Sequence, residues 1–455
     1  MKILLAASYF LYPSSNGGAQ MCRRVAHGLR EAGHDVVVSC IDFVGERGKE
    51  FRTKWVEQDS YKVFAITPPE RRAGYVQPLW RLKPSIQLSH IAQELCETTR
   101  PDLVYVNASL EIPDFSLVPH KLGIPTIFHV HCFGHLCAQQ FLMDGNEQIC
   151  SGPESLRKCF RCLQKDHGTP RQILEIISSF PIGSRLVTGF LGKARASSFQ
   201  LYQGVKNIFA FTKELHQSVD AYIVTADSIA ETETKYGAPK ERIHILPHFL
   251  PEDRLKRSDR RDRAKGERAR VGFFGRIARE KGFDLLVEAL KKVNSKHPGL
   301  FDLWVISREG NPEDILKRFN GTTVSSERIR VFNNLTGAAL NPVIAGLDVC
   351  IIPSLCLEIG PLTMLEAMAQ GVPCIISDSV GMKSLIQDDH NGRLFPTGNV
   401  EVLRKILTDL LIRPDILETW KRQLPQIASE EEYITSLENI FHTITRAGKT
   451  QVCAG

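Results

Sequence analysis

The chain has 455 residues, 43% of them hydrophobic and 24% charged, a composition typical of a globular protein with about two domains. No run reaches the roughly twenty apolar residues of a membrane-spanning helix, and the short apolar start MKILLAASYF is predicted to be a strand rather than a signal peptide. Nine basic and three acidic residues between positions 254 and 270 account for the net charge of +6, which argues against nucleic-acid binding.

We expect this basic segment to be a solvated linker, and contact with an anionic membrane surface is the alternative. The protein is predicted to be cytoplasmic, or at most peripheral at the inner face of the membrane. Twelve cysteines are also typical of a reducing compartment, where thiols stay free or bind metal.

The N-terminal part of the sequence predicts a βαβ unit with a glycine-rich first turn. Strands are expected at Lys2 to Ser8 and His34 to Cys40, with a helix between them at Ala19 to Ala32. The turn contains Gly17 and Gly18 but lacks the Gly-x-Gly-x-x-Gly pattern of a dinucleotide site. The two glycines either let backbone amides approach a phosphate or simply form a tight turn.

Further parallel strands are predicted at Asp102 to Val106 and at Thr126 to His131. His131 would then lie at the carboxyl end of a strand, where α/β folds place functional side chains. A structural histidine is the alternative. The region from Ser178 to Phe211 mixes aromatic, basic and small residues and is expected to shape an acceptor site.

A cysteine-rich insertion, at about residues 132–165, interrupts this alternation of strands and helices. Four thiolates that include one Cys-x-x-Cys pair suit tetrahedral zinc, which would stabilise a loop with little apolar core. Free thiols or a redox pair are the alternatives. The predicted ligands are Cys137, Cys150, Cys159 and Cys162.

A second βα series begins after Arg270 and predicts a second domain of the same class. Strands are expected at VGFFG, Leu303 to Ser307, Ile329 to Phe332 and Val349 to Pro353, with the amphipathic helix FDLLVEALKKV after the first. The predicted fold is therefore α/β, with two Rossmann-like domains facing each other across a cleft. The expected divisions are a domain at 1–250, the linker at 251–270, a domain at 271–415, and C-terminal helices at 416–455 that pack back toward the first domain.

Two acids and two basic residues are the candidate site of the second domain. Glu358 lies in a loop, and Glu366 lies about two turns into a helix predicted to begin near Pro361. Carboxylates at a helix N-terminus suit sugar hydroxyls, whereas Arg276 and Lys281 suit a diphosphate. The alternatives are a capped core helix and a solvated basic loop.

These motifs resemble a known family. GRIAREKGFDLLVEAL, PSLCLEIGPLTMLEAMAQGVPCIISD and NGRLF closely resemble the donor domain of family 4 retaining glycosyltransferases of the GT-B fold. The two glutamates separated by seven residues are the family's best-known signature. NGGAQ, the strand ending at His131 and the segment DAYIVTADSIAETETKYGAPKERIHILPHF resemble the family's N-terminal domain more loosely.

The resemblance implies a role for each candidate residue. Arg276 and Lys281 would hold the donor diphosphate, Glu366 the ribose of the nucleotide, and Glu358 the hydroxyls of the transferred sugar. His131 would contact the donor sugar, and Gly17 and Gly18 would present amides from the first domain. The implied catalytic residues are His131, Arg276, Lys281 and Glu358, and the implied donor-binding residues are Gly17, Gly18, Arg276, Lys281, Glu358, Gly360, Pro361, Leu362 and Glu366.

The implied reaction moves a sugar from a UDP- or GDP-sugar to a hydroxyl of a glycan or lipid-linked acceptor, in the assembly of a cell-envelope glycan or exopolysaccharide. The anomeric configuration would be retained without a covalent nucleophile. The sequence contains no Asp-x-Asp motif for a divalent cation, so no cofactor is expected for catalysis, and the zinc of the insertion would be structural. The alternatives are a GT-B phosphorylase or synthase and a non-catalytic carbohydrate-binding scaffold.

Overall fold

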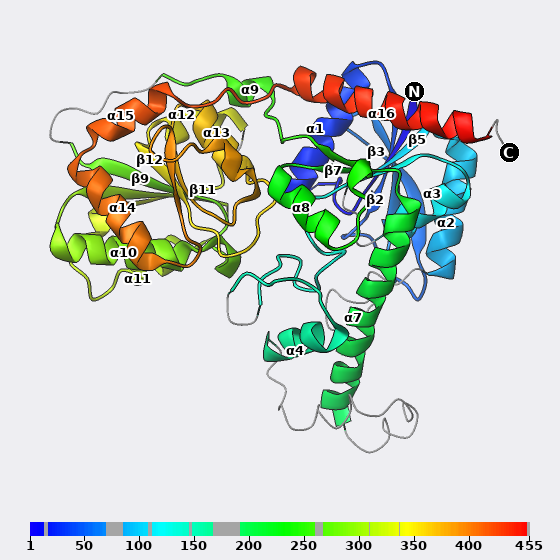
Figure 1. Cartoon of the computed structure of the whole chain (residues 1–455), viewed down its shortest axis with the longest axis horizontal. Helices are drawn as coiled ribbons and strands as arrows, with labels where there is room; N and C mark the ends of the chain where they lie inside the picture. Colours follow the sequence, from blue (N-terminus) through cyan, green and yellow to red (C-terminus); the bar gives the residue numbers. More distant parts are fainter. Residues whose placement is uncertain are drawn as a thin grey trace. The chain divides into compact units, whose positions relative to one another are not determined.

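The computed structural model describes residues 1–12, 17–69, 85–107, 112–144, 148–166, 192–259, 267–308, 310–335 and 337–452. The chain forms two compact units, each built around its own sheet (Figure 1). Unit 1 comprises Met1–Asn146, Cys150–Leu246 and Ile434–Gly455, and unit 2 comprises Glu147–Ile149 and Pro247–Tyr433.

The sheet of unit 1 has eight strands in the order β3-β4-β2-β1-β5-β6-β7-β8. All neighbours are parallel except β3 and β4, which form an antiparallel hairpin at one edge. The strands are β1 (Lys2–Ala7), β2 (Asp35–Ile41), β3 (Arg52–Gln58), β4 (Tyr61–Thr67), β5 (Leu103–Asn107), β6 (Thr126–His129), β7 (Ala221–Val224) and β8 (Ile243–Ile245).

Helices cover this sheet because each has one apolar face. In α1 the buried residues Ala19, Cys22, Val25, Ala26 and Leu29 recur at helical spacing. The helices that lie wholly in unit 1 are α1 (Gly17–Glu31), α2 (Ile86–Thr99), α3 (Asp114–Lys121), α4 (Leu156–Asp166), α7 (Gly192–Ser218) and α8 (Asp227–Lys235).

The last helix, α16 (Glu430–Val452), belongs to unit 1 from Ile434 onward. The ring of Phe441 packs edge-on against Tyr105 of β5, with 6.2 Å between the ring centroids. The carboxylate of Glu438 pairs with the His34 ring at 2.9 Å. These two contacts fix the C-terminal helix to the same unit as the first strand.

The sheet of unit 2 has six parallel strands in the order β11-β10-β9-β12-β13-β14. The strands are β9 (Ala269–Phe274), β10 (Phe301–Ser307), β11 (Ile329–Asn333), β12 (Val349–Ile352), β13 (Cys374–Ser377) and β14 (Gly392–Phe395). Figure 1 shows the strands as a layer between helices. The helices of unit 2 are α9 (Glu252–Leu255), α10 (Phe283–Lys296), α11 (Pro312–Lys317), α12 (Leu340–Ala345), α13 (Leu362–Ala369), α14 (Val400–Ile412) and α15 (Asp415–Arg422).

Both sheets have a topological switch point, where the strand order reverses and two neighbouring strands lead into helices on opposite faces. In unit 1 it lies between β1 and β5, and in unit 2 between β9 and β12. Ligands of open α/β sheets bind beyond the carboxyl ends of the strands at such points. The predicted Rossmann-like class is confirmed, and the topology indicates where the sites should lie.

Several predicted boundaries were wrong. The strand predicted to end at His131 ends at His129, and the one predicted over ERIHILPHF is limited to Ile243–Ile245. The β3–β4 hairpin was not predicted. Of the region expected to shape an acceptor site, residues 178–191 lie outside the described residues, and residues 192–211 lie in α7.

The prediction of a solvated linker at 251–270 was also wrong at both ends. Residues Glu252–Leu255 form α9, and strand β9 already begins at Ala269. Arg254 is only 3% exposed, and Arg257 donates from Nε to the carbonyl of Ala369 at 3.2 Å. Residues 260–266 lie outside the described residues. Arg254 therefore belongs to the interior of unit 2 and is not available to a membrane surface.

Among the described residues, no helix combines the length and the apolar character needed to cross a membrane.

Candidate functional site

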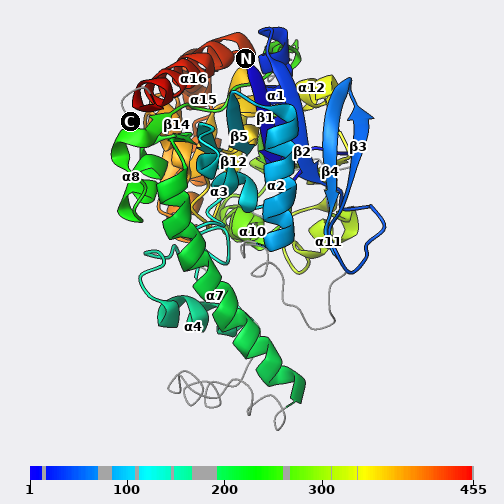
Figure 2. The same cartoon turned by 90° about the vertical axis from the view of Figure 1, so that its right-hand side faces the viewer.

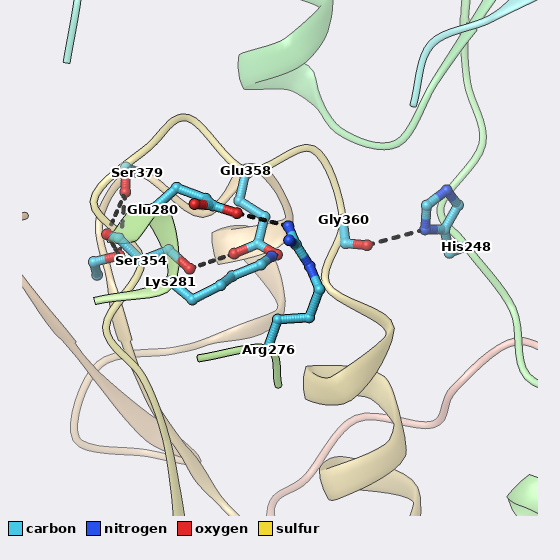
Figure 3. Close-up of polar contacts among 9 residues, drawn as sticks. His248, Arg276, Glu280, Lys281, Ser354, Glu358, Gly360 and Ser379 are labelled. Atoms are coloured by element: carbon cyan, nitrogen blue, oxygen red, sulfur yellow. Dashed lines mark hydrogen bonds and ion pairs between the residues drawn. The ribbon is translucent and has the colours of Figure 1, made fainter. Parts of the chain in front are cut away.

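The candidate site of unit 2 lies at its switch point, where the segments that follow β9 and β12 meet (Figure 3). Lys281 follows β9 and donates from Nζ to Oε1 of Glu358, which follows β12. The hydroxyl of Ser354 donates to the other carboxylate oxygen. Glu358 is therefore held at both oxygens, and its side chain remains 10% exposed.

The loop that carries Glu358 is fixed through its backbone. Its N–H donates to the carbonyl of Ser379 at 3.2 Å, and its carbonyl accepts from the N–H of Gly381 at 2.6 Å. The hydroxyl of Ser379 donates to the carbonyl of Ser354 at 3.2 Å. These bonds join the loop after β12 to the loop after β13, so the carboxylate is presented by a rigid support.

Lys281 is positioned by a turn that requires glycine. It ends the short helix η3 (Arg279–Lys281), and Gly282 follows in the left-handed region with φ +68°. A Cβ at Gly282 would lie 1.8 Å from the carbonyl oxygen of Pro353. The carbonyl of Glu280 also accepts from the N–H of Leu355 at 2.9 Å. The Lys-Gly motif therefore places the amine against the loop after β12.

Burial is the largest single effect on the pKa of Lys281 and lowers it, but the charge of Glu358, the neighbouring Cys356 and the hydrogen bond to Glu358 together outweigh burial, so the pKa lies above its ordinary value. The amine is thus a cation at neutral pH. Arg276 provides a second cation at the end of β9, where it is 46% exposed and donates from Nη2 to Oε1 of Glu280 at 2.6 Å. Two cations, Lys281 and Arg276, therefore lie next to Glu358 (Figure 3).

Helix α13 begins next to this group of charges. Pro361 is its N-cap, with ψ 111°, so the helix begins near Pro361 as predicted. No side chain caps this N-terminus. The carbonyl of Gly360 bonds to Nδ1 of His248 at 3.2 Å. The first amides of α13 thus begin directly after the loop that carries Glu358, with Leu362 as the first helical residue.

Glu366 is the fifth residue of α13, closer to its start than the predicted two turns, and it is buried. Its Oε1 pairs with Nε of Arg254 at 3.3 Å and with Nη2 at 3.2 Å. Arg254 also donates from Nη1 to the carbonyl of Gly337 and to Oδ1 of Asn341. Each of the two acids of the motif therefore has its own cation, Lys281 for Glu358 and Arg254 for Glu366.

The switch point of unit 1 brings together three other residues. Asn107, the last residue of β5, donates from Nδ2 to the carbonyl of Gly18 at 3.3 Å. Its Oδ1 lies 2.7 Å from Nε2 of His131. Since that amide oxygen can only accept, Nε2 of His131 carries the proton. Asn107 thus connects the start of α1, which begins at Gly17, to the predicted histidine.

Sequence reasoning missed Asn107, Arg254 and Ser354. Asn107 is the residue after the predicted strand Asp102 to Val106. The rule that selected His131, that functional side chains lie at the carboxyl ends of strands, therefore applied equally to Asn107. Arg254 had no comparable signal, because it stands in a run of surface-type charges and its partner is 112 positions away.

The cysteines of the insertion also lie near one another. All four are free thiols, and they lie in the turn at Cys137, the loop at Cys150 and helix α4. Burial raises the pKa of Cys159 to about 12, and the other three thiols raise it further by their charge. The thiols of Cys150 and Cys162 act on Cys137 in the same sense.

The sequence matches two family profiles. Residues 268–412 match the family described as Glycosyl transferases group 1, and residues 16–158 match the family described as Glycosyl transferase 4-like domain. The first match covers β9 to α14 with Lys281, Glu358 and Glu366. The second covers α1, His131 and most of the cysteine-rich insertion.

Two curated relatives are similar over large parts of the chain. An α-D-kanosaminyltransferase of Streptomyces kanamyceticus is 25% identical over 229 residues, which are 48% of this chain and 58% of that protein. The lipopolysaccharide core biosynthesis glycosyltransferase LpsE of Rhizobium meliloti is 24% identical over 270 residues, or 58% of this chain and 74% of that protein. The match thus spans little more than half the length of the Streptomyces protein.

Solved structures show the same fold over the whole chain. The Anabaena protein HepE, solved in complex with UDP, has a TM-score of 0.59 at 13% identity and covers 100% of both chains. WaaG, a glycosyltransferase involved in lipopolysaccharide biosynthesis, has a TM-score of 0.56 at 15% identity and covers 98% of this chain and 99% of its own. At such low identity these likenesses show the fold alone.

Proposed function

Because the chain belongs to the group 1 glycosyltransferases and has the GT-B fold, we propose that it transfers a sugar from a nucleoside diphosphate sugar to an acceptor hydroxyl, with retention at the anomeric carbon. The observation that supports this best is the pair of Lys281 and Glu358 at the switch point of unit 2. The Lys281 cation and the Glu358 carboxylate lie there next to the N-terminus of α13, whose N-cap residue makes no side-chain capping bond.

The donor diphosphate is assigned to the positive groups of this site. Lys281 supplies a compact charge, and Arg276 supplies a planar fork of donors that matches two phosphate oxygens. The amides at the start of α13 add partial positive charge. Pro361 has no N–H, so the contribution of the loop comes from Gly360 and Leu362. Charge that develops on the leaving diphosphate is stabilised by these same groups.

The two acids are assigned to neutral hydroxyls. Glu358 accepts from the transferred sugar, and its two internal bonds, from Lys281 and Ser354, fix the direction of the carboxylate. Glu366 accepts from the ribose. A carboxylate has about four acceptor positions, so Glu366 has capacity for a ribose hydroxyl in addition to Arg254.

Unit 1 is assigned the remaining donor contacts. We assign His131 to the donor sugar and the amides of Gly17 and Gly18 to a donor phosphate. The hydrogen bond that His131 donates to Asn107 supports this role for His131, because it fixes the ring and the tautomer. No side chain is assigned as a covalent nucleophile. We therefore expect attack from the face of the leaving group, whose phosphate takes up the proton of the acceptor hydroxyl.

The nature of donor and acceptor is part of the proposal. The HepE structures contain UDP and UDP-glucose, which makes a UDP-sugar the first donor to test and a GDP-sugar the second. LpsE and WaaG act in lipopolysaccharide biosynthesis, which supports a glycan or lipid-linked acceptor of the cell envelope. A cytoplasmic location fits a chain with twelve cysteines.

The separate roles assigned to Glu358 and Glu366 give the decisive test. Glu366→Ala is expected to weaken binding of free UDP or GDP, measured by calorimetry, because the ribose loses its acceptor. Glu358→Ala is expected to leave that affinity within about twofold and to lower the transfer rate by about 100-fold, as for loss of one transition-state contact. Circular dichroism controls for folding. Equal losses in both assays for both variants would refute the assignment.

A further inference from the structure

The cysteine-rich insertion of unit 1 has no role in the proposed transfer, and its four cysteines come from three separate pieces of chain. Cys137 lies in a turn, Cys150 lies in the following loop, and Cys159 and Cys162 lie on α4. We propose that these four thiolates bind one structural Zn²⁺, which fastens the loop to α4.

The backbone around the first two cysteines is arranged to receive thiolates. The N–H of Gly152 donates to Sγ of Cys150 at 3.3 Å. The turn at Cys137 is closed by a bond from the N–H of Gln140 to its carbonyl at 2.9 Å, and the amides of Gln139 and Leu142 donate to its sulfur. A neutral thiol is a weak acceptor, whereas a metal-bound thiolate is stabilised by such amide bonds.

Helix α4 supplies the other two sulfur atoms from one face. Cys159 and Cys162 are three residues apart, so they are neighbours on the helix surface. Phe160 and Leu163 are buried, and the ring of Phe160 packs edge-on against Tyr202 of α7, with centroids 5.8 Å apart. Figures 1 and 2 show α4 lying beside α7. One face of α4 is thus used for packing and another carries the sulfur pair.

The loop between the turn and α4 is itself attached to the unit. Gly152 has φ +111°, and the hydroxyl of Tyr236 and the amine of Lys235, at the end of α8, both donate to the carbonyl of Ser151. Cys150 is therefore held near a fixed point of the fold.

The chemistry of the donor set selects zinc in a closed site. Four thiolates with one Cys-x-x-Cys pair suit tetrahedral Zn²⁺, and four protein ligands leave no position for a substrate, so the role is structural. Among the described residues, the sulfur atoms do not yet lie all within 4.8 Å of one another. Coordination of one metal by all four sulfur atoms requires them to come closer together, which couples metal affinity to the stability of the insertion.

Metal content of the full-length protein tests the proposal directly. Protein purified without added zinc is expected to contain one zinc per chain by plasma mass spectrometry. Replacement by Co²⁺ is expected to give the intense thiolate-to-cobalt absorption of a four-sulfur site. These readouts do not depend on transferase activity, and the wild-type protein suffices for both. Absence of zinc, or iron in its place, would overturn the proposal.

Variants identify the ligands. Cys159→Ser together with Cys162→Ser is expected to abolish stoichiometric zinc, whereas Cys132→Ser, a cysteine of the same insertion, is expected to retain it. Loss of zinc from the Cys132→Ser protein, or full zinc in the double variant, would show that the four ligands are wrongly assigned. Circular dichroism of each variant serves as the folding control.

Discussion

Arg254 and Glu366 form a buried ion pair whose members are 3% and 6% exposed. Replacing Arg254 by Met would leave the carboxylate buried without its cation. We expect the free energy of unfolding to fall by about 3 to 5 kcal/mol, the usual effect of removing one partner of a buried pair. Urea denaturation measures this change. Arg268→Met is the control, because Arg268 is 50% exposed and pairs with Asp302 at 2.9 Å, so its loss should cost at most about 1 kcal/mol.

A double variant of Arg254 and Glu366 distinguishes the effect of this ion pair on stability from its effect on nucleotide binding. In the double variant Arg254→Met with Glu366→Gln, the uncompensated charge is gone, so the destabilisation should be clearly smaller than the sum of the single effects. Nucleotide binding should remain weak, because the ribose acceptor stays altered. Additive destabilisation would show that the two side chains do not interact in the folded protein.

At the level of residues, the sequence predicted those positions whose chemistry is local. Lys281, Glu358 and Glu366 stand in short motifs, and the spacing of these motifs places them at strand and helix ends. Arg254 differs. The charged residues around it in the sequence predict an exposed segment, whereas its burial depends on packing against α13. Such a residue is found only when the tertiary structure shows where its side chain lies.

The turn at Gly282 fixes the position of Lys281, because Gly282 directly follows the short helix η3 that ends with Lys281. Gly282→Ala must adopt φ +68° and place a Cβ 1.8 Å from the carbonyl oxygen of Pro353. We expect a loss of stability well above the roughly 1 to 2 kcal/mol of left-handed strain, together with loss of transfer because Lys281 is displaced. Gly299→Ala is the matched control, since Gly299 has φ +86° with no atom within 4 Å. Equal losses of stability for the two variants in urea denaturation would contradict the clash.

Helix α7 is held near its end by His216. The ring bonds to the hydroxyl of Tyr222 at 2.8 Å and to the carbonyl of Tyr236 at 3.1 Å. Burial, aided by the charge of His135 and opposed by that of Glu233, lowers the pKa of His216 below 6.5. The unfolded chain therefore takes up a proton first as the pH falls, and the contribution of His216 to stability is complete above pH 6.5 and lost below it.

The His216→Gln variant should show this difference. Its deficit in unfolding free energy relative to the wild type is expected to be larger at pH 7 than at pH 5, measured by urea denaturation at both values. His90→Gln, which removes an exposed histidine of α2, is expected to have no such dependence. A deficit that is constant between the two pH values would show that the half-buried His216 ring does not titrate as proposed.

At the level of elements, the repeated βα units were predictable because parallel strands buried on both faces are nearly continuous apolar runs. The β3–β4 hairpin was not, because β3 is largely exposed and its turn residues Asp59 and Ser60 lack the usual Asn-Gly or Asp-Gly signal, although both have positive φ. Strand ends were misplaced where a strand is only three or four residues long, as in β6 and β8.

In the whole molecule, each sheet brings its candidate residues to its own switch point. Gly18, Asn107 and His131 meet beside β1 and β5, and Arg276, Lys281 and Glu358 meet beside β9 and β12. Topology explains why residues from distant parts of the sequence come together in each unit. The motifs of unit 2 were easier to predict than the connection through Asn107, because they combine charged residues with glycine at short spacing.

The charge balance of the donor site leads to a prediction for the intact enzyme. The diphosphate is met by Arg276, Lys281 and the start of α13, and the sequence has no Asp-x-Asp motif to carry a cation. We expect the rate of sugar transfer to be unchanged when Mg²⁺ and Mn²⁺ are removed, whereas Lys281→Ala should lower the rate equally with and without them. Chelator-treated enzyme must be assayed for zinc in parallel, because loss of zinc from the insertion would lower stability by another route. A rate that falls on treatment and returns with Mg²⁺, while the zinc content stays constant, would show that the protein cations do not suffice for the leaving group.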